Sequence, residues 1–191
     1  MGHKLIIHGG FFSESRTNSE IKLAKQQALS DIVKRSYDYL NSHSALETSV
    51  FAVSLLEDCD LFNAGIGSQI QSDGKIRLSA GLMDGSSGKF SGVINIEDVR
   101  NPILIAEKLM SVDDRVLSGR GALDYARSNG FEYFNPETQQ RREEYERKLE
   151  ASQGLGTVGC VALDSKGNIA AATSTGGKGF EIPGRVSDSA T

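Results

Sequence analysis

A run of small residues near the end of the chain most constrains what this sequence can fold into. Residues 154–163 form a glycine-flanked apolar run, residues 164–168 carry a turn signal, and residues 169–175 consist mainly of alanine and threonine. This pattern predicts two strands joined by a tight turn, that is, a buried hairpin. Because small side chains leave room beside a strand, we expect a ligand or another backbone segment to approach this hairpin closely.

The rest of the chain predicts further strands and several helices. Short apolar or alternating runs predict strands, and capping-box and Asn-Pro patterns predict helix starts. Strands followed by helices and then again by strands indicate an α+β or layered sandwich fold. The expected strands are 4–8, 75–82 and 90–96, and the expected helices begin at Thr17, Ser44, Asn101, Ala122 and Asn135.

Composition and charge narrow the classes of function. The 191 residues carry a net charge of -4, and no basic stripe is present, which argues against a nucleic-acid or anionic-membrane partner. No apolar run approaches the roughly 20 residues needed to cross a bilayer, and the N-terminus lacks the pattern of a signal peptide. We therefore expect a cytoplasmic protein with a small-molecule or protein partner. Cys59 and Cys160 are expected to be free thiols, because neither lies at zinc-ligand or redox-pair spacing.

A charged segment precedes the small-residue hairpin. Residues 139–153 contain four basic and four acidic residues and little apolar surface. Such a segment is typical of a solvated helix or a linker.

Thr157 is the candidate nucleophile. It follows Gly156 at the start of the predicted hairpin, directly after the charged segment. A threonine hydroxyl reacts poorly unless a base lies beside it, and the residue's own α-amine, which titrates near pH 8, can act as that base once the Gly156-Thr157 bond is cut. Glycine before the cut eases the strained geometry of attack. A Gly-Thr pair at a strand start is also an ordinary structural feature, so the pattern alone leaves both interpretations open.

The hairpin and its surroundings resemble the plant-type L-asparaginase and isoaspartyl aminopeptidase family of N-terminal-nucleophile hydrolases. The resemblance covers essentially the whole chain. It implies an α+β fold of the four-layer αββα sandwich type, which we expect to be incomplete in these 191 residues. The matching segments are Gly156-Thr157-Val158-Gly159, residues 173–177, Pro183-Gly184-Arg185-Val186, Asp188-Ser189, His8-Gly9-Gly10, residues 61–67 and Met83-Asp84-Gly85.

The resemblance implies a precursor that cuts itself between Gly156 and Thr157. The cut would separate residues 1–156, an alpha-subunit part that includes a charged linker at about 137–156, from residues 157–191, the start of a beta subunit. Thr157 would then act as nucleophile and base. Thr175 would orient its amine or hydroxyl, and Asn63 would help to hold that group.

The resemblance also implies a substrate and an ion. Arg185 offers a planar fork for an α-carboxylate and Asp188 could take the α-ammonium group, although a surface ion pair is the alternative. Hydrolysis of L-asparagine or of β-aspartyl dipeptides through an acyl-enzyme is expected, without a catalytic cofactor and by a dimer of cleaved α/β units. By analogy, a structural sodium ion would be bound by the backbone carbonyls of Leu56, Glu57, Cys59, Phe62, Ala64 and Ile66.

Departures from the family pattern leave the substrate preference open. Phe11-Phe12, residues 178–182, Ser187 and Ala190 differ from the usual residues. The sequence also lacks the later Thr-Thr-Gly-like motif that supplies oxyanion donors in the family. The alternative hypothesis is therefore a truncated, catalytically incomplete homologue that acts as a binding or scaffold protein.

Overall fold

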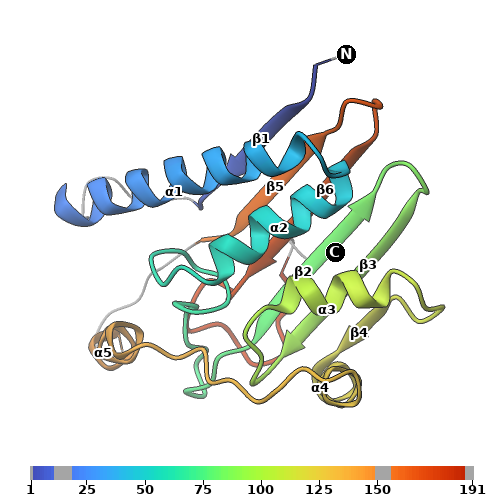
Figure 1. Cartoon of the computed structure of the whole chain (residues 1–191). Coiled ribbons are helices and arrows are strands. Elements are labelled where there is room, and N and C mark those ends of the chain that lie inside the picture. Colours follow the sequence, from blue (N-terminus) through green and yellow to red (C-terminus); the bar gives the residue numbers. More distant parts are fainter. Residues whose placement is uncertain (1, 11–18, 149–155, 188–191) are drawn as a thin grey trace.

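The computed structural model describes residues 2–10, 19–148 and 156–187 as one mixed sheet with helices packed on it. This confirms the expected α+β class. Figure 1 shows α1, α2 and α3 running across the same face of the sheet. The elements are β1 (Lys4–His8), α1 (Ser19–Leu40), α2 (Ala45–Glu57), β2 (Leu78–Asp84), β3 (Lys89–Ile96), α3 (Pro102–Leu109), β4 (Val116–Ser118), α4 (Gly119–Ser128), α5 (Gln139–Lys148), β5 (Val158–Leu163) and β6 (Ile169–Thr175).

The small-residue hairpin lies inside the sheet. The strand order is β1-β5-β6-β2-β3-β4, so β5 and β6 are inserted between the first strand and the earlier hairpin of β2 and β3. All pairings are antiparallel except that of β3 with β4. Every residue from Ala170 to Ala172 is an alanine, and two of the three are buried. The short side chains let α2 pack closely on β5 and β6.

The core lies between the sheet and the helices. Ile7, Cys160, Ala172 and Leu82 are successive partners across four strands, and they lie on the face that the helices cover. Val53, Leu56 and Ile103, from α2 and α3, complete this cluster and are fully buried. Burial of this apolar surface is the main force that holds the helices on the sheet.

The opposite face of the sheet is not covered by the described residues. Ile6, Val161, Ala171 and Met83 are successive cross-strand partners on that face. Ile6 is 71% exposed, and Val161 and Met83 are each 40% exposed. An exposed apolar row across a sheet is unusual for a monomer and marks a surface that normally packs against something.

Several predicted boundaries shift. Strand β2 begins at Leu78, not at Lys75, because the Lys75 carbonyl accepts a hydrogen bond from the Gln71 amide in a turn. The last helix begins at Gln139, not at Asn135, whose Oδ1 instead accepts from the Glu137 amide 3.0 Å away. The three-residue strand β4 was not predicted from the sequence.

Other predictions hold. Ser44 begins α2 with both hydrogen bonds of the expected capping box. Thr17 and Asn18, the first half of the predicted capping box at 17–20, lie outside the described residues, and α1 is described from Ser19. Cys59 and Cys160 are free, as expected. None of the described helices is long and apolar enough to span a membrane.

The charged helix α5 is attached more firmly than expected for a solvated linker. Arg141 donates from Nε to the Gly67 carbonyl at 2.5 Å, and its side chain is only 11% exposed. The Tyr145 ring stacks on Phe180 with centroids 4.8 Å apart. The first contact ties α5 to the loop that carries Asn63, and the second ties it to the segment after β6.

Candidate active site

Thr157 and Thr175 meet at the edge where β5 begins and β6 ends. The strand register pairs Val158 with Ser174, which places the residues just beyond them opposite each other. The Thr157 hydroxyl donates to Thr175 Oγ1 across 3.4 Å. Thr175 is 1% exposed, so this contact lies at a largely buried position.

Asn63 approaches the same point from the loop between α2 and β2. Its Nδ2 donates to the Gly156 carbonyl at 2.6 Å and to the Gly177 carbonyl at 2.5 Å. Its Oδ1 accepts from the Gln69 amide at 2.9 Å, which fixes the orientation of the side-chain amide. Asn63 is 8% exposed, and its three hydrogen bonds satisfy a buried polar group.

The Gly156 carbonyl therefore has two donors. The Thr175 hydroxyl donates to it at 3.1 Å and accepts from the Gly177 amide at 3.0 Å, beside the Asn63 amide. Two donors converging on one carbonyl oxygen resemble an oxyanion hole, in which preorganised hydrogen bonds stabilise developing negative charge. The carbonyl they hold belongs to the peptide bond directly before Thr157.

Glycines allow the backbone to pack this tightly. At Gly176, a β-carbon would overlap the Ser68 side chain and lie 2.8 Å from Asn63 Oδ1. At Gly10, where φ is +96°, it would lie 3.4 Å from the Thr157 carbonyl oxygen. A side chain at residue 176 would displace Ser68 or Asn63, whereas at Gly10 the space is sufficient and the positive φ is what favours glycine. The contact with Ser68 was not predicted from the sequence.

Of the two predicted substrate ligands, the structure describes Arg185 but not Asp188. Arg185 is partly exposed, and its carbonyl accepts from Asn95 Nδ2 at 3.2 Å. No ion pair of Arg185 occurs among the described residues. Asp188 lies outside those residues, so the pairing of these two groups stays a prediction.

The predicted sodium loop folds back on the end of α2. The Glu57 carbonyl accepts from the Ile66 amide at 2.8 Å, and the Cys59 carbonyl accepts from the Phe62 amide at 3.1 Å. A β-carbon at Gly65, where φ is +51°, would overlap the Glu57 carbonyl. Backbone oxygens are among the donors that hard cations prefer. Three of the six predicted carbonyls, those of Leu56, Glu57 and Cys59, already accept backbone hydrogen bonds, so the sodium site stays a prediction.

Glu57, named above only for its backbone carbonyl, has a buried acidic side chain that the sequence analysis did not predict. Its side chain is fully buried, and Oε1 accepts from the Ile103 amide at the start of α3 at 3.1 Å. Burial raises the pKa of Glu57 to about 8, against the opposing effect of the nearby Ser174 hydroxyl. Val50, Val53 and Glu57 follow helical spacing, so the position of Glu57 on the apolar face was the available signal.

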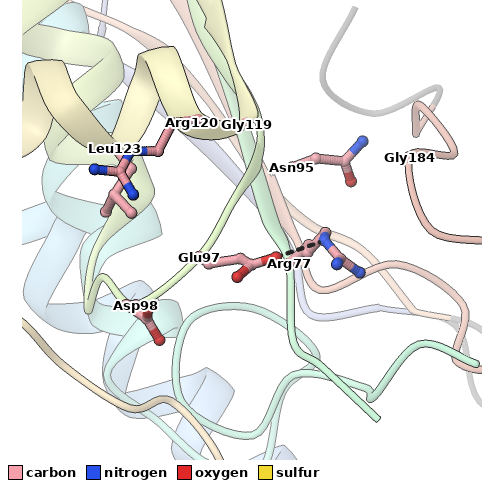
Figure 2. Close-up of a pocket in the computed structure, with 8 residues that line it drawn as sticks. All are labelled: Arg77, Asn95, Glu97, Asp98, Gly119, Arg120, Leu123 and Gly184. Carbon is pink, nitrogen blue, oxygen red and sulfur yellow. Dashed lines mark ion pairs between the residues drawn. The ribbon is translucent and has the colours of Figure 1, made fainter. Parts of the chain in front are cut away.

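A pocket of about 370 Å³ opens between the end of β3 and the start of α4. Figure 2 shows Glu97 paired with Arg77 on one side, and Gly119, Arg120 and Leu123 on the other. Gly184 also lines the pocket, one residue before Arg185. Thr157 is not among the residues that line it, so this pocket is distinct from the predicted nucleophile site.

The Thr157 hydroxyl thus lies beside a carbonyl held by two donors, an arrangement of the kind that hydrolases use. Comparison with known proteins agrees. The asparaginase family model matches residues 1–191, and the chain belongs to this family. Members of this family have the N-terminal-nucleophile hydrolase fold.

Three relatives illustrate the match. Proteins named isoaspartyl peptidase/L-asparaginase from Nostoc sp. and Synechocystis sp. are 45% and 43% identical to this chain, over 98% and 100% of its length. The isoaspartyl peptidase of Escherichia coli is 40% identical over 99% of the chain. The chain spans 65%, 63% and 66% of the lengths of these three relatives.

Proposed function

We propose that the protein is a self-cleaving threonine amidohydrolase that acts on L-asparagine, on β-aspartyl dipeptides, or on both. The observation that carries the proposal is the Gly156 carbonyl oxygen, which accepts from Asn63 and Thr175 directly beside the Thr157 hydroxyl. The names of the relatives support this substrate class. They also favour an enzyme over the alternative of a binding or scaffold protein.

The first reaction is cleavage of the chain. Thr157 Oγ1 attacks the carbonyl carbon of Gly156, and the two donors stabilise the charge that develops on the carbonyl oxygen. The carbon–nitrogen bond then breaks, and the hydroxyl proton ends on the new amine. Water hydrolyses the resulting ester, which leaves a carboxylate on Gly156 and a free amine and hydroxyl on Thr157. The cut separates residues 1–156 from the part that begins at Thr157.

The second reaction is turnover of substrate. The free α-amine of Thr157 takes the hydroxyl proton while Oγ1 attacks the side-chain amide carbonyl of the substrate. Ammonia or an amino acid leaves with that proton, and an ester links aspartate to Thr157. Water hydrolyses the ester and releases aspartate. Thr175, 3.4 Å from Thr157 Oγ1, orients the nucleophile in both reactions.

Charge selects the substrate in this scheme. Arg185 pairs with the α-carboxylate in a planar, two-point contact, and Asp188 takes the α-ammonium group. A free aspartyl-type amino acid carries both groups, whereas an asparagine inside a protein chain carries neither. No cofactor is needed, because the threonine supplies nucleophile and base.

The proposal extends to a second sheet, a bound ion and the assembly of the protein. A second sheet on the face that carries Ile6, Val161 and Met83 completes a four-layer αββα sandwich and covers this exposed apolar row. The loop from Leu56 to Ile66 holds a structural sodium ion by its backbone carbonyls. The cleaved α/β units form dimers in the cytoplasm, as the family resemblance implies.

Denaturing mass spectrometry of the full-length protein tests the proposal. We expect a split between residues 156 and 157 together with release of ammonia from L-asparagine or of aspartate from a β-aspartyl dipeptide. Thr157→Ala should abolish the split and both activities, and Thr157→Ser, which keeps a hydroxyl, should retain slow cleavage. A single uncut mass together with neither activity in the full-length wild-type protein would contradict the proposal.

A further inference from the structure

The segment after β6 departs from the family pattern and carries a buried acid, Glu181. Glu181 is only 3% exposed. The backbone around it is fixed on both sides, since the Phe180 amide donates to the Ile70 carbonyl at 3.0 Å and the Ser72 amide donates to the Glu181 carbonyl at 3.1 Å. The backbone from which this side chain extends is therefore fixed.

The Glu181 carboxylate lies directly against Gly177. A β-carbon at residue 177 would overlap Glu181 Oε1 and lie 2.9 Å from its Cδ. Gly177 has φ of +82°, a conformation that glycine adopts easily and other residues rarely do. The carboxylate thus occupies the space that only a glycine leaves open, and it limits how the turn after Thr175 can move.

Gly177 connects this contact to the site. Its amide donates to Thr175 Oγ1 at 3.0 Å, and its carbonyl accepts from Asn63 Nδ2 at 2.5 Å. Both partners also donate to the Gly156 carbonyl. A displacement of Gly177 would therefore move both donors at once.

A chain of polar contacts holds the carboxylate from behind. Gln71 Nε2 donates to Glu181 Oε1 across 3.5 Å, and Arg77 Nη1 donates to Gln71 Oε1 at 2.5 Å. Arg77 is fixed in turn by ion pairs with Asp73 and with Glu97, the latter visible in Figure 2. The second carboxylate oxygen, Oε2, has no hydrogen-bond partner among the described residues, so the hydrogen bond from Gln71 reaches the same oxygen that lies against Gly177.

We infer that Glu181 is a positioning residue for the nucleophile site. Its carboxylate, held by Gln71, packs against Gly177 and fixes the position of that residue. The Thr175 hydroxyl and the Asn63 amide then reach the same carbonyl oxygen, that of Gly156. The inference rests on the proposed function. It adds a residue from the segment where this chain differs from the family pattern.

The test compares variants of the full-length protein by two measurements, the rate of cleavage between residues 156 and 157 and the separate kcat and KM values for the β-aspartyl dipeptide. We expect Glu181→Ala to lower the cleavage rate and kcat by at least about tenfold, with KM changed less than about threefold, because positioning errors well below the size of a residue are costly. Glu181→Gln keeps the shape and an acceptor for Gln71, and should stay within about threefold of wild type. Glu132→Ala, an exposed glutamate, is the matched control and should not change either rate.

The outcomes are distinct. Wild-type rates in Glu181→Ala, or losses in Glu181→Gln as large as in Glu181→Ala, overturn the inference while leaving the proposed function intact. If Glu181→Ala fails to fold, Gln71→Ala removes the support from behind and should give the same loss of kcat at a smaller cost in stability. A wild-type protein that neither cleaves itself nor turns over substrate overturns the proposed function, and the inference with it.

Discussion

Replacement of Asn63 by alanine should slow self-cleavage while leaving the protein folded. The change removes the Nδ2 donor that lies 2.6 Å from the Gly156 carbonyl oxygen, the shorter of the two hydrogen bonds to that atom. Loss of one oxyanion donor costs roughly 10²–10³ in rate, about 3–4 kcal/mol in the barrier. The Thr175 hydroxyl remains, so cleavage should be slowed and not abolished.

The cost in stability is of similar size. Asn63→Ala removes hydrogen bonds to the Gly177 carbonyl and from the Gln69 amide. Each buried polar group left without its partner costs about 1–3 kcal/mol, so the two together cost about 2–6 kcal/mol. Because domains of this kind are stable by roughly 5–15 kcal/mol, the variant should remain folded at moderate temperature.

The assay follows the fraction of cut chain by denaturing mass spectrometry from the time of synthesis, and circular dichroism confirms the fold. Asn41→Ala, at an exposed position after α1, is the matched control and should cleave at the wild-type rate. Thr175→Val removes the other donor with little change in volume, and should slow cleavage in the same way. Cleavage of folded Asn63→Ala within about threefold of wild type would refute the role assigned to this carbonyl.

Two further predictions concern stability. Burial raises the pKa of Glu57 to about 8 in the folded protein, against an ordinary value of 4.5. Between these pH values the folded state keeps a proton that the unfolded chain releases. The free energy of unfolding should therefore fall as the pH rises, by up to about 1.4 kcal/mol per pH unit. Urea unfolding from pH 5 to pH 8 should show this slope in wild type and a flatter one in Glu57→Gln; equal slopes would contradict the buried acid. Gly176→Ala should lower the free energy of unfolding by about 1–3 kcal/mol, because the added methyl group overpacks against Ser68. The double variant Gly176→Ala/Ser68→Gly should recover part of this loss. A urea midpoint of Gly176→Ala equal to that of wild type would contradict the prediction.

The hairpin of β5 and β6 could be predicted from sequence because its signals are local. The small apolar residues and the Asp164–Asn168 turn lie within 20 positions of each other. In the turn, Asp164 Oδ1 accepts hydrogen bonds from the amides of Lys166 and Asn168. The strand order could not be predicted in this way. The insertion of the hairpin between β1 and β2 depends on packing between segments that are far apart in sequence.

The site was predictable only where a resemblance supplied long-range information. Asn63 and Gly156 are 93 positions apart, and the loop that carries Asn63 has no helical or strand period. The burial of the Glu57 side chain was not predicted, because an acid in the last turn of a helix is usually solvated. Its burial is decided by α3, whose Ile103 amide approaches from another part of the chain. Glu181 was noted only as part of a departure from the family, since nothing local shows that it lies against Gly177.

The two donors on Gly156 have a further consequence for the proposed order of events. Before cleavage, Asn63 and Thr175 are both engaged with the Gly156 carbonyl, so they cannot serve a substrate. Cleavage turns that carbonyl into a carboxylate at the end of a separate segment, and its departure frees both donors beside the new Thr157 amine. The same side chains can then hold the amine and hydroxyl of Thr157. A variant that cannot cleave should therefore lack turnover for two reasons, an absent base and an occupied site, and supplying an external amine should not rescue it.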